Sequence, residues 1–230
     1  THENSSAASD VYKRQVQPRL LLLDEPFSDL DTNLKREIID DTLHLINSLD
    51  SSAIVVTHNA EEAMFLSNVI VVMEKGSIVQ IGKPREIYFN PSNVYVASLF
   101  GEVNIFKTKI LNNKCETPLG ILDTKDFKDN QQVNVVVRPE AIKLNVEKSP
   151  VASPNSGVVV DSKFLGNSAI IHMTVNDRDN NKHHIHSKLI GEFLPAPASS
   201  VSFSLDLNHV FIFPRSVSYT HLRAHETWSY

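Results

Sequence analysis

Apolar residues follow two different patterns along the chain. In the first part, apolar runs within residues 20–23 and 52–59 are typical of strands buried on both faces of a parallel sheet. Residues 33–49 carry apolar side chains along one helical stripe, and residues 60–67 predict a second, short helix. The alternation of strand and helix predicts an α/β fold for this part.

A hairpin and two short helices are expected to complete the first part. Residues 68–82 predict two strands that turn at residues 74–76. Residues 83–91 predict a short helix with Pro84 in its first turn, and residues 92–101 predict one more.

After about Gly101, the apolar residues come in short runs that are separated by turn residues. This pattern predicts an all-β domain, either a small barrel of the OB type or a sandwich. Residues 147–157 are rich in Pro and Ser and predict a linker or a long loop between strands. We therefore expect a partial α/β domain at residues 16–100 and an all-β domain at residues 101–215.

Composition excludes several classes of protein. The 230 residues are 41% hydrophobic, enough for a packed core, and their net charge of −5 gives no nucleic-acid-binding footprint. Cys115 is the only cysteine, so no intramolecular disulfide can form, which fits a reducing compartment. No apolar run approaches the roughly 18 residues of a membrane-spanning helix, and the N-terminus lacks the apolar stretch of a secretory signal. We expect a soluble, cytoplasmic protein with no nucleic-acid partner.

The two ends of the chain carry no apolar period and no turn pattern. One DNA element can encode both of them, because a coding sequence for Asp10–Gln15, reverse-complemented and read in another frame, gives Val217–His221. The element resembles a transposon-type adapter used in sequencing libraries. We therefore expect residues 1–15 and 216–230 to be adapter-derived and non-native, and the natural protein to extend upstream. Two natural tails are the alternative, and resequencing the source gene decides between them.

Acidic residues and a histidine stand at the ends of the two predicted parallel strands. Asp24 and Glu25 follow the first apolar run directly, and His58 follows the second. Each is a weak signal alone, because many strands end on acids and a lone histidine is more often structural. Together they suit a nucleotide site, in which Asp24 would hold Mg²⁺ through water, Glu25 would act on the attacking water and His58 would contact the γ-phosphate.

The chain resembles the second half of an ABC-transporter ATP-binding subunit, a P-loop NTPase, in two stretches. These are LLLLDEPFSDLD (residues 20–31) and IVVTHNAEEAMFLSNVIVVMEKGSIVQIGKPREIY (residues 54–88). The resemblance implies that Asp24 and Glu25 close the Walker B motif and that His58 is the switch histidine. It also implies a D-loop with the cofactor-binding residues Ser28, Asp29 and Asp31. The implied cofactors are ATP and Mg²⁺, and the implied catalytic residues are Glu25 and His58.

The phosphate-binding half of such a site is not among the 230 residues. A P-loop has the pattern G-x-x-x-x-G-K-[ST], and none of the seven glycines has that spacing followed by Lys and Ser or Thr. No two glycines are adjacent either, so the Leu-Ser-Gly-Gly-Gln signature of the family is missing. We expect both elements to precede Val16 in a longer protein, and the chain as given to be inactive.

The second part resembles the accessory β domain called TOBE, which follows import ATPase domains, in VVVRPEAIKL (residues 135–144). Members with this layout import ferric iron, polyamines, sugars or similar solutes, and LFGEVNIF (residues 99–106) favours the iron and polyamine group. The implied partners are permease subunits in the inner membrane, a second ATPase copy and, indirectly, a periplasmic or surface solute-binding protein. The implied location is peripheral, on the cytoplasmic face of the membrane.

Two other functions stay open. A non-transport ABC ATPase is one, although the β domain argues against it, and a ligand-sensing β module is the other. The run HHIH at residues 183–186 also invites a metal site, because His184 and His186 share a face of a strand and His172 could lie near them. We favour a solvated hairpin for this run, since no acidic or Cys ligand completes a familiar spacing.

Overall fold

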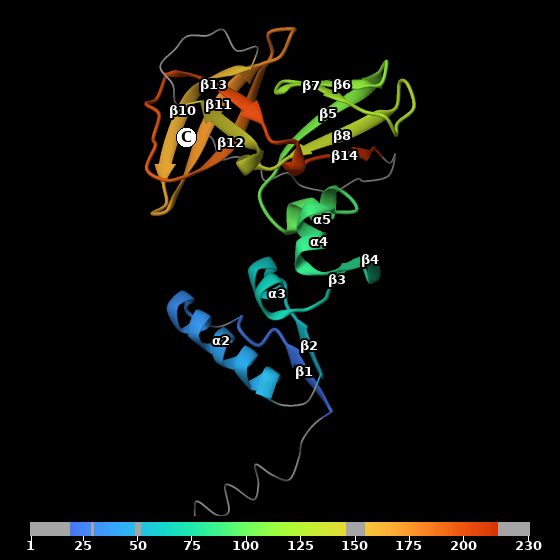
Figure 1. The fold of residues 1–230 in the computed structure, drawn as a ribbon, viewed down its shortest axis with the longest axis vertical. Coiled ribbons are helices and arrows are strands. Elements are labelled where there is room, and N and C mark those ends of the chain that lie inside the picture. The colour runs from blue at the N-terminus through green and yellow to red at the C-terminus, as the bar shows by residue number, and fades with distance from the viewer. Residues whose placement is uncertain (1–18, 29, 49–51, 146–154, 216–230) are drawn as a thin grey trace, which may run out of the picture. The chain divides into compact units, whose positions relative to one another are not determined.

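The computed structural model describes residues 19–28, 30–48, 52–145 and 155–215 (Figure 1). The chain divides into two compact units between Ile87 and Tyr88. The proposed adapter-derived ends, the predicted D-loop residue Asp29 and most of the predicted Pro/Ser loop lie outside the described residues.

The first unit begins with the parallel pair that the apolar runs predict. Strand β1 (Leu20–Asp24) pairs with β2 (Ser52–Val56), and helix α2 (Thr32–Ser48) lies between them in the chain. Helix α3 (Ala60–Leu66) follows β2, and its first turn is capped by the side chain of Asn59, which accepts hydrogen bonds from two backbone amides. The strand–helix order of the sequence is therefore present.

A hairpin follows, made of β3 (Ile70–Glu74) and β4 (Ser77–Gly82). Its two central residues, Lys75 and Gly76, have φ angles of 49° and 78°. Positive φ at both positions is the geometry of a type I′ turn, which matches the twist of the strands it joins. Helix α4 (Pro84–Phe89) begins at the predicted proline and spans the boundary between the units.

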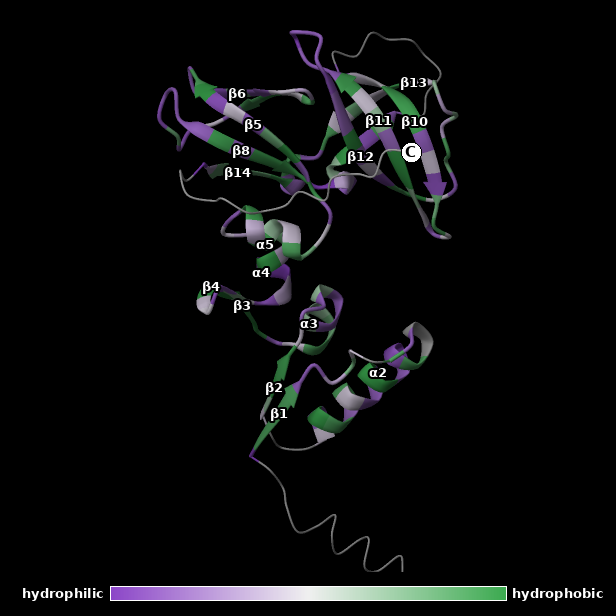
Figure 2. Cartoon of the chain, turned by 180° about the vertical axis from the view of Figure 1, so that it is seen from behind, coloured by the Kyte–Doolittle hydropathy of each residue, from purple (hydrophilic) through white to green (hydrophobic). Residues whose placement is uncertain are grey.

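The parallel pair is not buried on both faces, which corrects the expectation from its apolar runs. Side chains in β1 and β2 alternate between exposed and half-buried. Leu22 and Ile54, which pair in register, are 67% and 54% exposed. Two strands within the described residues form too small a sheet to cover both of its own faces. Figure 2 colours most of both strands as hydrophobic.

The second unit contains two five-stranded antiparallel sheets, preceded by the short helix α5 (Val94–Leu99). One sheet has the order β14-β8-β5-β6-β7 and the other β12-β11-β10-β13-β9. The strands of the first sheet, in chain order, are β5 (Asn104–Leu111), β6 (Lys114–Thr117), β7 (Gly120–Asp123), β8 (Gln132–Val137) and β14 (Val210–Pro214). Those of the second are β9 (Ile142–Asn145), β10 (Ser156–Phe164), β11 (Ser168–Asn176), β12 (Lys182–Ile190) and β13 (Ser200–Leu205).

Both sheets contribute to one hydrophobic core. Ile110 of β5 and Val135 of β8 belong to the same buried cluster as Ile171 of β11 and Phe203 of β13. Inward side chains alternate with exposed ones along most strands, as expected for sheets with one face on a core. The second unit therefore has a core of its own, and the prediction of an all-β domain is confirmed.

Arg138 is completely buried just after β8 and ties residues 88–99 to the sheet. Its guanidinium donates hydrogen bonds to the carbonyl oxygens of Tyr88, at 3.1 Å, and Ala97, at 3.3 Å, and lies 3.9 Å from the centre of the Tyr88 ring. The Tyr88 hydroxyl donates to Glu140, and burial together with this bond raises the pKa of Tyr88 to about 12. Residues 88–100, which the sequence pattern grouped with the α/β part, thus lie in the second unit.

Candidate functional site

The carboxyl end of β1 carries two exposed carboxylates, Asp24 and Glu25. Asp24 is the last residue of the strand, and Glu25 has a φ of 43°, in the left-handed region that costs a non-glycine residue about 1 kcal/mol or more. The backbone amide of Glu25 donates to the carbonyl oxygen of Val56 at 2.8 Å, so the turn stays attached to β2. The chain therefore bends sharply where the acids leave the sheet.

His58 lies next to Glu25, at the same edge of the parallel pair. Its Nδ1 is 3.2 Å from Oε1 of Glu25, and the two side chains are 74% and 47% exposed. The residues come from the ends of β1 and β2, and the parallel register places these ends side by side. The two residues that the sequence predicts as catalytic are thus brought together, with a solvent-exposed side on which a substrate or a water could bind.

A buried carboxylate supports the loop that carries His58. The Thr57 hydroxyl donates to Glu62 at 2.5 Å, and the Lys35 ammonium of α2 lies 2.5 Å from the same carboxylate. Burial by itself would raise the pKa of Glu62, but the hydrogen bonds from Lys35 and Thr57 outweigh it and lower the pKa below its ordinary value. This network was not predicted from the sequence. Its one sign there is Glu62, on the inner side of the short amphipathic helix α3.

The predicted D-loop residues have local structural roles. The Ser28 hydroxyl donates to the carbonyl oxygen of Glu25 at 3.1 Å, which places Ser28 beside the candidate site. Asp31 instead accepts a hydrogen bond from the Leu34 amide at 3.1 Å and so caps α2. The structure therefore joins Ser28 to Glu25 and assigns Asp31 to the start of its own helix.

Comparisons with known proteins identify part of the second unit. Residues 135–213, which run from β8 to β14, match the family described as TOBE domain. These residues form a TOBE domain. Its Arg-Pro-Glu segment contains the buried Arg138, so the residues that carried the resemblance also anchor the domain to α5.

The chain is similar, across both units, to several proteins named spermidine/putrescine import ATP-binding protein PotA. The relative from Mannheimia succiniciproducens is 34% identical over 83% of this chain and 52% of its own length. The relative from Clostridioides difficile is 37% identical over 70% of this chain and 47% of its own, and that from Clostridium acetobutylicum 41% over 65% and 43%. The chain with the TOBE domain thus spans about half the length of the curated relatives it matches.

Proposed function

We propose that the intact protein is the ATP-hydrolysing subunit of an ABC importer, and that residues 19–87 carry the hydrolytic half of its nucleotide site. The contact between Glu25 and His58 at the carboxyl ends of two adjacent parallel strands carries the proposal. Ligands of open parallel sheets bind at this edge. The similarity to import ATP-binding proteins supports the same reading.

The described residues fit one half of an ATP site. Exposed carboxylates beside an imidazole suit Mg²⁺ held through water at Asp24, a water positioned or deprotonated by Glu25 and a γ-phosphate contact from His58. Bound Mg²⁺ and ATP would supply the phosphoryl group and neutralise its charge. Glu25 would accept a proton from the attacking water, and His58 would orient Glu25 or the phosphate. Ser28, whose hydroxyl donates to the carbonyl oxygen of Glu25, lies next to these residues in the same half of the site.

The phosphate-binding half of the site is expected in the part of the relatives that this chain does not span. The P-loop and signature patterns are missing from the 230 residues, and the chain covers 52% of the length of its Mannheimia relative. The exposed apolar side chains of Leu22 and Ile54 would be covered once further strands or helices pack on the parallel pair. The non-transport ABC ATPase is disfavoured because the TOBE domain accompanies this half.

The solute and the partners follow from the same proposal. The names of the relatives favour polyamines over ferric iron, which the sequence left open. Two ATPase subunits would work with permease subunits in the inner membrane and with a solute-binding protein, from the cytoplasmic face. Among the described residues no helix is long and apolar enough to cross a membrane.

Uptake by cells that lack their own polyamine-import ATPase subunit tests the proposal. The complete gene, with its upstream sequence restored, should recover uptake of radiolabelled spermidine, whereas Glu25→Gln should not. Glu61→Gln is the matched control, because Glu61 lies exposed in α3 and should leave uptake intact. Recovery of ferric-iron uptake instead would change the solute, and uptake by Glu25→Gln at the wild-type rate would contradict the role of Glu25.

A ligand-sensing β module is the second candidate function, because the second unit has a hydrophobic core of its own. It is tested by the melting temperature of the whole chain with spermidine present and absent. A rise in melting temperature with spermidine that persists in Glu25→Gln would favour a sensing function. No rise would argue against sensing and leave the ATPase as the one proposed function.

A further inference from the structure

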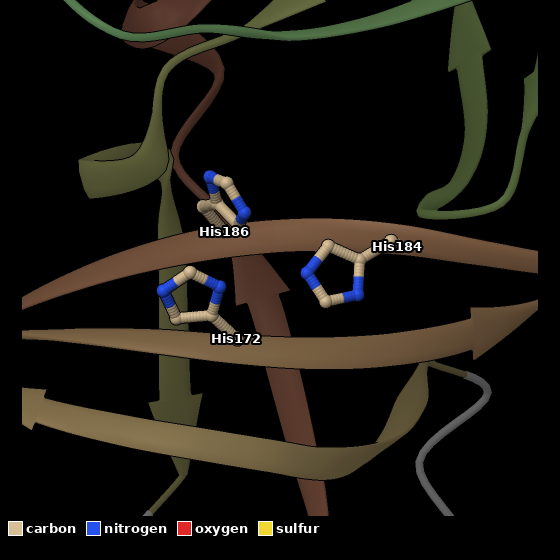
Figure 3. A group of neighbouring side chains, drawn as sticks. All are labelled: His172, His184 and His186. Atoms are coloured by element: carbon tan, nitrogen blue, oxygen red, sulfur yellow. The ribbon is translucent and has the colours of Figure 1, made fainter. Parts of the chain in front are cut away.

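Three histidines gather on one face of the second sheet of the TOBE domain (Figure 3). His172 comes from β11, and His184 and His186 come from β12. His172 and His186 are direct cross-strand partners, and His184 lies two residues along β12 from His186, so all three side chains leave the sheet on the same side. Each ring offers one nitrogen, and these three nitrogens lie within 4.8 Å of one another.

The geometry is close to that of a nitrogen-ligated metal centre. The ring centres are 4.4 Å apart for His172 and His186, 5.3 Å for His184 and His186, and 5.6 Å for His172 and His184. Ligands of a tetrahedral Zn²⁺ at about 2.0–2.1 Å lie about 3.4 Å from one another. The three histidine nitrogens lie within 4.8 Å of one another, and small side-chain rotations would bring them to the tetrahedral spacing. Such rotations are open to these rings because His184 is exposed and the other two are only half-buried. The open side leaves the fourth position for a water or an exogenous ligand.

The backbone beneath the cluster is held from two directions. The buried side chain of Asn104 in β5 accepts a hydrogen bond from the amide of His186 and donates to its carbonyl oxygen, both at 2.8 Å. The next residue, Ser187, is completely buried and donates to the carbonyl oxygen of Ile142 at 2.8 Å. A ligand set on strands fixed in this way needs little reorganisation to bind an ion.

Nearby acidic residues suit a cation. Asp161 of β10 is the cross-strand partner of His172 on the side away from β12, so a carboxylate stands beside the cluster. The carboxylate of Glu102 lies near His186. Lys163 pairs with Asp161 at 2.7 Å and neutralises part of its charge. These acids therefore add negative potential near the histidines but are not proposed as ligands.

We propose that His172, His184 and His186 form a binding site for a divalent transition metal ion that prefers imidazole nitrogen, with Zn²⁺ as the reference ion. This reverses the preference for a solvated hairpin at residues 183–186. That preference rested on the lack of an acidic or Cys ligand at a familiar spacing. The register of β11 and β12 places His172, which the sequence offered as a possible neighbour, directly opposite His186 and so supplies a third imidazole.

The neighbouring His183 offers a matched control. It belongs to the same run of residues, but the alternation of the strand turns it to the other face, where its ring lies 2.9 Å from the Asp177 carboxylate. A variant series can therefore replace His184 of the cluster or His183 beside it, and both replacements change the composition of β12 in the same way.

Zn²⁺ titration of the whole 230-residue chain against a fluorescent chelator tests the site. The wild-type chain and His183→Asn should bind one more Zn²⁺ than the triple variant His172→Asn, His184→Asn, His186→Asn. Each single substitution in the cluster should weaken that extra site at least about 10-fold, since one of three protein ligands is lost. Co²⁺ in place of Zn²⁺ should give visible absorption bands of low-symmetry coordination in the wild-type chain and not in the triple variant.

Equal affinity and stoichiometry in the wild type and the triple variant would overturn the proposal and assign the metal to the other histidines of the chain. So would a loss of binding in His183→Asn as large as in His184→Asn. Thermal unfolding in EDTA separates loss of the site from loss of the fold. If the triple variant does not fold, His184→Asn decides, because His184 is the exposed member and its replacement leaves the core intact.

Discussion

Replacing Arg138 with alanine should destabilise the TOBE domain severely. The change removes two hydrogen bonds from a charged donor, to the carbonyl oxygens of Tyr88 and Ala97, and the stacking of the guanidinium on the Tyr88 ring. Both carbonyls lie in the short helices α4 and α5, where a buried cation satisfies groups that water does not reach. No part of Arg138 is exposed to solvent, so water cannot replace what is lost.

The magnitude follows from these contacts. Each hydrogen bond from a charged group contributes roughly 1.5–3 kcal/mol, and truncation of a buried arginine also leaves a cavity. Removing the cost of burying the charge offsets part of this, so breaking such a buried interaction costs about 3–5 kcal/mol in net unfolding free energy. For a unit of this size each kcal/mol shifts the melting temperature by roughly 4 °C. We expect Arg138→Ala to lower it by roughly 12–20 °C.

Thermal unfolding of the whole chain, followed by circular dichroism, measures the shift. Arg178→Ala is the matched control, since Arg178 is 68% exposed and pairs with Glu116 at 2.5 Å on the surface. An exposed pair contributes at most about 1 kcal/mol, so this variant should melt within a few degrees of the wild type. If Arg138→Ala melts as high as Arg178→Ala, the assignment of residues 88–99 to the second unit through Arg138 is wrong.

Three further predictions concern the first unit and the boundary. The chain as given should show no saturable ATP binding at micromolar concentrations in equilibrium dialysis. Saturable binding would refute the claim that this chain lacks the phosphate-binding half of the site. The lowered pKa of Glu62 means that its contribution to stability is present above its unfolded pKa and lost as pH falls through the lower folded value. The free energy of unfolding in urea, measured between pH 3 and 6, should therefore depend less on pH in Glu62→Gln than in the wild type. An equal pH dependence in the two proteins would rule out a stabilising role of ionised Glu62. Limited proteolysis should leave a resistant C-terminal piece that starts between Tyr88 and Gly101, whereas a resistant N-terminal piece would contradict the two-unit division.

Sequence patterns predict the elements of this chain better than its contacts. Apolar runs and a proline mark β1, β2 and α4 to within three residues, and short alternating runs mark the all-β unit. The pairing of Glu25 with His58 is also predictable, because parallel strands bring their carboxyl ends to one edge.

Contacts between distant segments could not be predicted in the same way. Nothing in the sequence around Arg138 indicates that its guanidinium binds carbonyls at residues 88 and 97, because a buried arginine departs from the usual polarity of a core. The proximity of His172 to His186 depends on a strand register that local patterns do not fix. The exposure of Leu22 follows from the number of strands in the sheet and not from its own apolar run.

ATP hydrolysis by the complete protein tests the central claim most directly. With the upstream coding sequence restored, the wild type should hydrolyse ATP, and Glu25→Gln should retain ATP binding while its turnover falls by about 10²–10⁴-fold, since a positioned general base contributes that much. His58→Ala should also impair turnover, because its ring lies 3.2 Å from the Glu25 carboxylate. Turnover by Glu25→Gln at the wild-type rate, with Glu61→Gln as the control, would contradict the claim that this strand edge is the hydrolytic site.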